Sequence, residues 1–255
     1  MLRSRLIPLL LISDGSLVKS KNFSDYKYIG DPLNAVRIFN EKNVDELIIL
    51  DISLSKDKNK ISAQQIKDIA SHCRMPVCYG GGIKNIQTVE SIISLGVEKI
   101  SFGSVAFERP EIIKEAINLT GSQSIVVVLD YKKPRFSKDN YCFINNGKLN
   151  TNMILSEAID KFSSLGVGEI ILQSIERDGT RKGYDICTYK ELIQNTNKVV
   201  TIAGGAGKIQ HLIEANSDLG PIGLAAGSLF VLHGIHEAVL LTYPTKYEKL
   251  NILRK

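Results

Sequence analysis

Short apolar runs alternate with amphipathic segments along the chain of 255 residues. Runs rich in Val, Ile and Leu lie at residues 6–11, 47–50, 76–79, 99–102, 125–130, 169–173, 199–203 and 222–225. Continuous apolar runs of this length are typical of parallel strands that are buried on both faces. Between them, apolar residues spaced three and four apart predict helices at 34–43, 63–72, 111–118, 153–165 and 189–194.

Eight strands that alternate with helices predict a (β/α)8 TIM barrel, an α/β fold that typically takes about 250 residues. A doubly wound open sheet is the alternative, but it usually has fewer strands. Several predicted helices begin at residues suited to a helix start, namely Asp31 before Pro32, Ser62 and Pro110. We therefore favour the barrel.

An internal repeat indicates how this barrel is built. Residues 76–107 align with residues 199–230, and residues 44–48 align with 167–171. The longer alignment places Gly80, Gly81, Gly96, Gly103 and Ser104 on Gly204, Gly205, Gly220, Gly227 and Ser228. The copies lie about half a chain apart, whereas solenoid repeats recur every ~20–50 residues. We expect one domain over residues 1–255, with duplicated half-barrels at about 1–120 and 121–240 and a C-terminal tail at 241–255.

Composition and charge exclude several classes of function. The chain is 44% hydrophobic and 23% charged, which excludes disorder, and no apolar run approaches the ~20 residues of a membrane span. The net charge of +5 comes without a dense basic stripe, so we expect no nucleic-acid partner. The four cysteines lack CxxC spacing, and no carboxylate or cysteine joins His233 and His236 at ligand spacing. We expect a cytoplasmic protein with reduced thiols, no metal and no cofactor.

Each half carries a Gly-Gly pair after one strand and a Gly-Ser pair after the next. Glycines at strand ends let backbone N–H groups approach an anion closely, and barrels commonly bind phosphate where strand ends meet short helices. The repeat therefore predicts two phosphate-binding sites that face each other across the barrel mouth, and tight turns without a ligand are the alternative. The first would comprise Gly81, Gly82 and Ser104, and the second Gly205, Gly207, Gly227 and Ser228.

Residues 6–19, 30–32, 45–52, 79–83, 121–130, 175–185 and 203–207 closely resemble the cyclase subunit of imidazole glycerol phosphate synthase. The resemblance covers essentially the whole chain. It implies a (β/α)8 barrel that binds a glutaminase subunit as a heterodimer. Ammonia would pass from the N-terminal face of the barrel to an active site at its C-terminal face, where a bis-phosphorylated substrate reacts.

The resemblance implies paired catalytic aspartates, and only one is present here. Asp130 matches the second aspartate, whereas Leu11 stands at the position of the first. Asp14 would substitute only if its loop folded inward, and loss of one member of such a pair costs ~10²–10⁴ in rate. Lys19, in the loop after the first strand, is a candidate for closing over a substrate phosphate. Further departures from the family pattern occur at Gly103, Gln173, Glu176 and Ala203.

The opposite face of the barrel keeps the family pattern. Arg5, Glu46, Lys99 and Glu169 match a ring of charges that closes the barrel floor and gates ammonia entry in that family. Glu98 and Gln123 match positions that meet the glutaminase. A purely structural ion-pair cluster is the alternative interpretation of the ring.

Residues 227–245 and 34–43 resemble second-copy paralogs that are associated with the amidation of surface polysaccharides. In that subgroup a separate sugar amidotransferase is thought to use the ammonia. Three hypotheses follow from the sequence. The chain delivers ammonia for sugar amidation, it is a working cyclase of histidine biosynthesis, or it is a non-catalytic activator of a glutaminase.

Overall fold

The computed structural model describes residues 3–53 and 62–254. Within these ranges, eight parallel strands form a closed barrel, because each pairs with the next and β10 also pairs with β7. The order is β10 (Glu169–Ser174), β11 (Val199–Ala203), β12 (Gly223–Ala226), β1 (Arg5–Ser13), β4 (Leu47–Asp51), β5 (Val77–Gly80), β6 (Lys99–Phe102) and β7 (Ile125–Lys132). The predicted barrel is confirmed, and the ends of its strands differ from the prediction by at most two residues.

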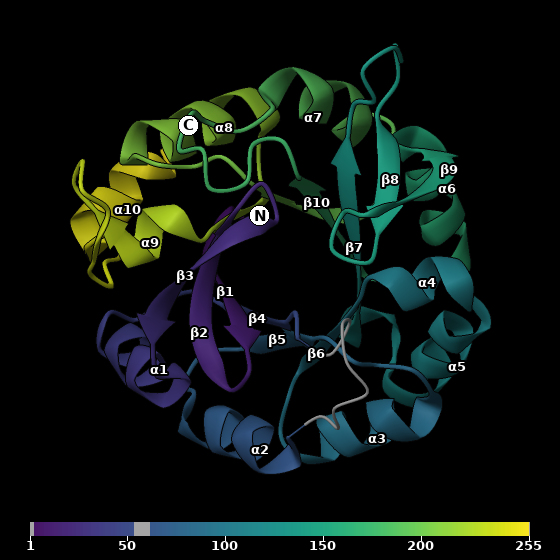
Figure 1. Cartoon of the computed structure of the whole chain (residues 1–255), viewed down its shortest axis with the longest axis horizontal. Coiled ribbons are helices and arrows are strands. Elements are labelled where there is room, and N and C mark those ends of the chain that lie inside the picture. The colour runs from purple at the N-terminus through teal and green to yellow at the C-terminus, as the bar shows by residue number, and fades with distance from the viewer. Residues whose placement is uncertain (1–2, 54–61, 255) are drawn as a thin grey trace.

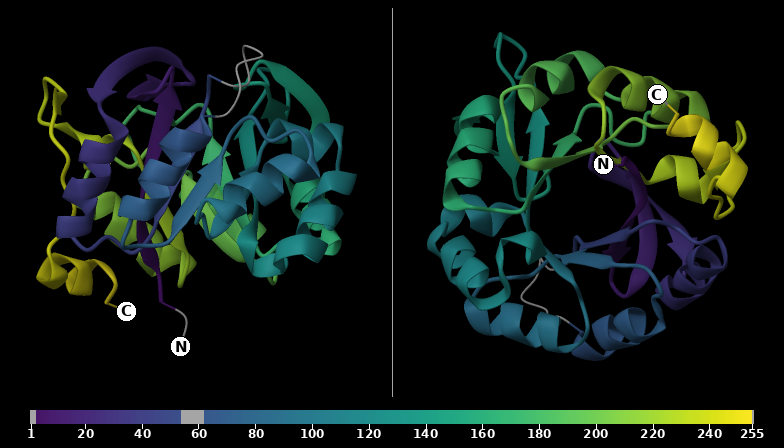
Figure 2. Two further views of the ribbon diagram at one scale, coloured as in Figure 1. Left: turned by 90° about the horizontal axis from the view of Figure 1, so that it is seen from below. Right: turned by 180° about the vertical axis from the view of Figure 1, so that it is seen from behind.

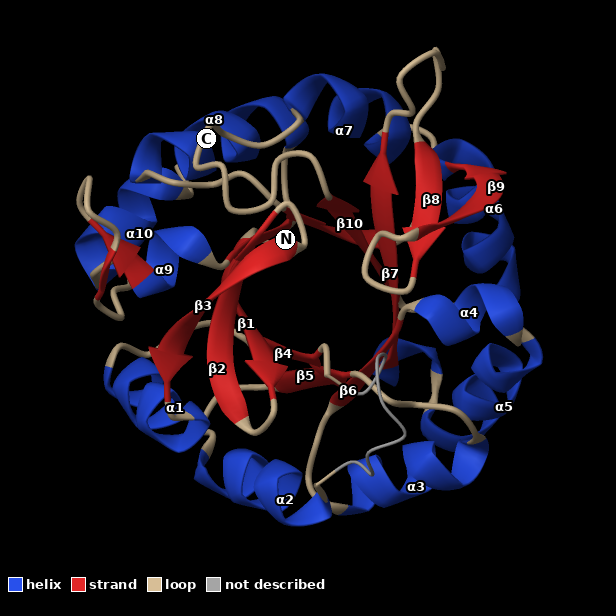
Figure 3. Ribbon diagram, viewed as in Figure 1, coloured by secondary structure: helices blue, strands red, loops and turns tan. Residues whose placement is uncertain are grey.

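Helices surround the barrel on all sides (Figure 1, Figure 3). Asp31 and Ser62 cap the first two helices by accepting hydrogen bonds from the backbone N–H groups of Asn34 and Gln65, as their sequence positions predict. The helices are α1 (Pro32–Glu41), α2 (Ala63–His72), α3 (Ile86–Ser94), α4 (Ser104–Glu108), α5 (Glu111–Thr120), the 3₁₀ turn η1 (Ser122–Ser124), α6 (Leu155–Leu165), α7 (Ile186–Ile193), α8 (Ile209–Leu219), α9 (Ser228–Val231) and α10 (Lys246–Ile252).

Side chains alternate between the two sides of each barrel strand. In β1, Leu6 and Leu10 pack into the core between strands and helices, whereas Ile7, Leu9 and Leu11 belong to a separate cluster inside the barrel. The rest of that inner cluster is Ile48, Cys78, Val126, Val128, Ile171, Ala203 and Ala225. The barrel therefore has a mostly apolar lumen between its two ends.

Two antiparallel extensions, absent from the predicted pattern, fold back over the C-terminal mouth (Figure 1). The first strap is β2 (Ser16–Lys21) with β3 (Ser24–Gly30), and it continues from β1. The second strap is β8 (Tyr141–Ile144) with β9 (Leu149–Ile154), and it continues from β7. Each leads into the next helix, so the two halves of the chain carry the same extension at equivalent positions.

Each strap is fastened to the opposite half of the barrel. In the first strap, the Asn22 side-chain amide donates to the carbonyl oxygen of Ile175, which follows β10, at 3.2 Å. In the second, the Asn146 side-chain amide donates to the carbonyl oxygen of Ile52, which follows β4, at 3.4 Å. Because β4 and β10 each follow the strap of their own half, the two contacts are related by the internal repeat.

The C-terminal tail packs at the other end of the barrel, where both termini lie (Figure 2). The Tyr243 hydroxyl donates to the carbonyl oxygen of Leu6 at 2.8 Å, and Lys249 of α10 pairs with Asp45. A short hairpin, β13 (Leu232–His233) with β14 (Ala238–Val239), precedes the tail. No helix among the described residues is both long and apolar enough to cross a membrane.

Candidate functional site

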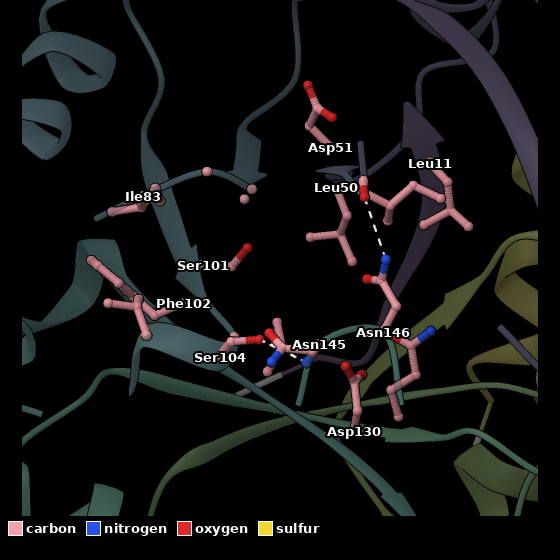
Figure 4. Close-up of a pocket in the computed structure, with 18 of the residues that line it drawn as sticks. Leu11, Leu50, Asp51, Ile83, Ser101, Phe102, Ser104, Asp130, Asn145 and Asn146 are labelled. Atoms are coloured by element: carbon pink, nitrogen blue, oxygen red, sulfur yellow. Dashed lines mark hydrogen bonds between the residues drawn. The ribbon is translucent and has the colours of Figure 1, made fainter. Parts of the chain in front are cut away.

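A cavity of about 600 Å³ opens at the carboxyl ends of the strands, mainly on the side of the first half-barrel (Figure 4). Its apolar wall includes Leu11, Leu50 and Val128, and the straps cover part of it through Tyr26 and Asn146. Polar groups converge from several strand ends, namely Asp51, Ser101, Ser104, Asp130 and Gln173. In TIM barrels, this end of the strands is where active sites lie.

Asp130 is the acid best placed for proton transfer in this cavity. It lies near the carboxyl end of β7, next to Gln173 of β10 in the strand register. Burial, and to a smaller extent the negative charge of Asp178, raises the pKa of the Asp130 carboxyl to about 7. A carboxyl with such a pKa exchanges protons readily near neutral pH.

The position that would hold a second acid remains apolar. Leu11 is 6% exposed and faces the cavity beside Leu50, its register partner in β4. Asp14 is exposed at the β1–β2 turn, does not line the cavity, and accepts a hydrogen bond from the Ser13 hydroxyl at 3.2 Å. Asp14 therefore does not replace the missing aspartate.

The first predicted phosphate-binding site borders the cavity. Gly81 and Gly82 have φ values of 120° and 65°, and a Cβ on Gly81 would lie 2.3 Å from the Asp51 carbonyl oxygen, so only glycine fits there. A Cβ on Gly103 would meet nothing within 4 Å, so this glycine enlarges the cavity. The Ser104 hydroxyl accepts a hydrogen bond from the backbone N–H of Asn145 at 3.0 Å.

The second predicted site is almost filled by protein. Gly205, Gly227 and Ser228 line a space of only about 10 Å³, together with Lys19 and Asp178. A Cβ on Gly205 would lie 2.1 Å from a backbone oxygen of the loop after β10, which packs directly against it. Gly207 is equally enclosed, because a Cβ there would lie 2.3 Å from the side chain of Arg181 in the same loop.

Lys19 lies in β2 and not in a loop as the sequence predicts. Its side chain is 7% exposed, and its ammonium group donates to the Asp178 carboxylate at 2.8 Å. The Ser20 hydroxyl donates to the other oxygen of Asp178 at 2.6 Å. In this arrangement the Lys19 ammonium group pairs with the Asp178 carboxylate. The two predicted phosphate-binding sites at the mouth are therefore not equivalent.

At the opposite end of the lumen, four charged side chains form a closed ring of alternating sign. Arg5 pairs with Glu46 and, at 2.7 Å, with Glu169. Lys99 pairs with the same two carboxylates at 2.8 and 2.9 Å. Thr201, which the sequence pattern does not single out, donates its hydroxyl hydrogen to Glu169 at 2.5 Å. The ring joins β1, β6, β10 and β11 with Glu46, which directly precedes β4.

Mutual attraction in this ring favours the charged forms of Arg5, Lys99 and Glu169. Burial raises the pKa of the Glu169 carboxyl, but the charges of Arg5 and Lys99 outweigh it and hold that pKa below its ordinary value. Burial likewise lowers the pKa values of Arg5 and Lys99, and the two carboxylates reverse this and raise both above their usual values. Cys78 lies just above the ring, where burial raises its pKa, so its thiol stays neutral.

The two residues predicted to meet a glutaminase lie on this N-terminal face. Glu98 is exposed just before β6, and its carboxylate accepts a hydrogen bond from the backbone N–H of Val77 at 2.8 Å. Gln123 is exposed in η1, just before β7. Glu98, Gln123 and the charged ring therefore share one end of the barrel, while Asp130 and Ser104 lie at the other.

Comparison with known proteins places this geometry in a family. A model of a family described as histidine biosynthesis protein matches residues 5–236. The chain belongs to this family.

Its relatives include imidazole glycerol phosphate synthase subunits along their full length. A provisionally named subunit HisF from Leptospira borgpetersenii is 49% identical over 250 residues, 98% of each chain. A provisionally named subunit hisF3 from Vibrio vulnificus is 45% identical over 253 residues, 99% of this chain and 97% of its own. A subunit HisF from Hydrogenobaculum is 36% identical over 244 residues, 95% of this chain and 96% of its own. The chain is thus a HisF-like member of the histidine biosynthesis family.

Sequence reasoning missed residues that act through the straps. Asp178 and Asn145 contact Lys19 and Ser104 only because the straps cross the mouth. Asp178 could have been noticed in the sequence, because it is a charged residue that directly follows Arg177 in a glycine-containing loop. Asn145 and Asn146 could also have been noticed, because Asn-Asn-Gly is typical of a tight hairpin turn.

Proposed function

We propose that this chain is the barrel subunit of a glutamine amidotransferase complex. It receives ammonia from a partner glutaminase at its N-terminal face, conducts the ammonia through its lumen and delivers it for amidation of a surface-polysaccharide sugar. The observation that carries the proposal is the complete ring of Arg5, Glu46, Lys99 and Glu169 below an apolar lumen. Such buried charges are expensive to keep for stability alone.

The chemistry at the mouth supports delivery over cyclisation. Cyclisation by paired acid and base needs a second proton-transferring group, and Leu11 cannot exchange a proton. The cavity retains Asp130, whose pKa near 7 leaves one proton-exchanging carboxyl at the exit. Neutral ammonia is the nucleophile that an acceptor sugar requires.

The first experiment combines the purified chain with the glutaminase of the same organism. We expect a complex at micromolar concentration and glutamine hydrolysis well above that of either protein alone. Ala225→Leu narrows the lumen, and Lys114→Glu on the outer surface of α5 serves as the control. When the sugar amidotransferase and its substrate are added, Ala225→Leu should lower the amount of amidated product while leaving glutaminase activation intact. Absence of a complex would refute the proposal, and unchanged product formation would favour a non-conducting activator.

A working cyclase is the second candidate, favoured by Asp130 and by the glycines that border the cavity. Its test supplies the bis-phosphorylated histidine-pathway intermediate with ammonium salts. Turnover that Asp130→Asn abolishes would establish the cyclase and displace the delivery proposal. Leu11→Asp is the companion variant, because it restores the missing carboxylate at the end of β1.

A further inference from the structure

The two straps differ in the connection that leads into them. In the first half, the connection between β1 and β2 consists of Asp14 and Gly15 alone. In the second half, residues 133–140 connect β7 to β8. We call this segment the β7–β8 loop. It projects beyond the ring of helices at the C-terminal end of the barrel (Figure 1), and the internal repeat gives no structural reason for its extra length.

The β7–β8 loop is an ordered turn that presents one aromatic side chain to solvent. The backbone N–H of Ser137 donates to the carbonyl oxygen of Pro134 at 2.9 Å, and Asp139 donates its backbone N–H to the Ser137 hydroxyl at 2.9 Å. Phe136, between them, is 94% exposed, with the Arg135 guanidinium 5.6 Å from its ring centre. A fixed turn lowers the entropy cost of docking, and aromatic and arginine side chains are the commonest anchors of protein interfaces.

The charge of the loop defines the partner it fits. Lys133, Arg135 and Lys138 are exposed, against a single acid, Asp139. A second copy of this chain would present the same basic loop and a net charge of +5, so like charges oppose self-association. The complementary surface is an acidic protein surface with an apolar pocket for Phe136.

We propose that the β7–β8 loop docks the enzyme that consumes the ammonia. This inference rests on the proposed function. Ammonia that leaves the mouth is protonated and diluted unless the acceptor site covers the exit and excludes water. The loop lies on the same face as the exit, and it continues directly from the strand that carries Asp130. The acceptor enzyme therefore binds the C-terminal face, opposite the glutaminase.

The test uses the complex of the chain and its glutaminase with the purified sugar amidotransferase of the same organism, immobilised for biolayer interferometry. Phe136→Ala should weaken binding at least tenfold, and Arg135→Glu should weaken it most at low salt, where the electrostatic attraction that it removes is least screened. Lys114→Glu makes the same change in net charge on the exposed side of α5 and should bind like the wild type. All variants should activate the glutaminase normally.

Several outcomes overturn the inference. Wild type that activates the glutaminase but does not bind the amidotransferase, or Phe136→Ala that binds like the wild type, refutes the docking role and leaves the glutaminase partnership standing. Failure to pair with the glutaminase at all refutes the proposed function instead. If the chain sediments with phosphatidylglycerol vesicles in a way that depends on Phe136, the loop binds a membrane and not the acceptor enzyme. If light scattering shows self-association that depends on Phe136, the loop binds a second copy of the chain instead.

Discussion

Replacing Glu169 with glutamine tests whether the floor of the barrel is one mutually neutralising unit. Glu169 is 4% exposed and meets Arg5, Lys99 and Thr201. The substitution keeps the shape but removes the charge, and it turns an amide N–H₂ group toward a cation. The ring then holds two cations against one carboxylate, that of Glu46.

The structure sets the expected magnitude. Removing one partner from a buried ion pair costs about 3–5 kcal/mol. The cations of this ring are 20–25% exposed, which places Glu169→Gln at the lower end, about 3 kcal/mol. For a chain of this size 1 kcal/mol corresponds to roughly 2–4 °C, so the unfolding midpoint should fall by roughly 6–12 °C.

A double-mutant cycle supplies the decisive measurement. Lys99→Met alone should cost about as much as Glu169→Gln, but the double variant leaves Arg5 paired with Glu46 and restores neutrality. Urea unfolding should therefore give a double-variant loss at least about 1.5 kcal/mol smaller than the sum of the single losses. Additive losses would refute the idea of a neutralising ring. Glu111→Gln, which breaks an exposed pair with Arg109, should cause no measurable change.

The ring also predicts a pH dependence. The pKa of Glu169 lies below its ordinary value of 4.5, so the folded state binds fewer protons there than the unfolded chain. Its stabilising contribution is present above that value and is lost as the pH falls through the folded pKa. Glu169→Gln should flatten the loss of stability between about pH 5 and pH 3. An unchanged acid slope would show that other carboxylates dominate.

Other substitutions test the mouth. The Asp130 pKa is raised to about 7, so its charged form destabilises the fold as the pH rises from about 4 to 7; Asp130→Asn should raise the thermal midpoint at pH 8 by several degrees and change it little at pH 4. Gly205→Ala should cost more than about 2 kcal/mol in urea unfolding, whereas Gly234→Ala, with a positive φ but open space, should cost about 1. Lys19→Met should cost about 3 kcal/mol, because Asp178 would remain buried without its cation, and Asp178→Asn in that background should recover part of the loss.

Much of this fold can be predicted from the sequence because the signals for its strands and helices are local. Apolar runs mark buried strands, and Asp31 and Ser62 mark helix starts, so the eight-stranded order follows. The charged ring was predicted through the family resemblance. The structure agrees with it, because Arg5, Lys99 and Glu169 begin strands and Glu46 directly precedes one, and strand beginnings meet at one end of a parallel barrel.

The straps were not predictable from the same signals. β3 is mostly exposed and no residue of β9 is fully buried, so neither strand shows the alternation that marks a half-buried strand. Consequently Lys19 was expected in a loop near a phosphate, whereas the structure buries it against Asp178. The unequal opening of the two glycine-rich sites follows from that contact, which connects residues 159 positions apart.

Through the crossed straps, each half of the barrel supplies a contact that the other half needs at the mouth. Asp178, in the second half, is neutralised by a lysine that the first half supplies, and Ser104, in the first half, receives its hydrogen bond from the second. A substitution at either donor therefore removes a contact from a residue in the opposite half of the molecule. Separate fragments that carry one half each should therefore lack these contacts at the mouth until the two halves combine.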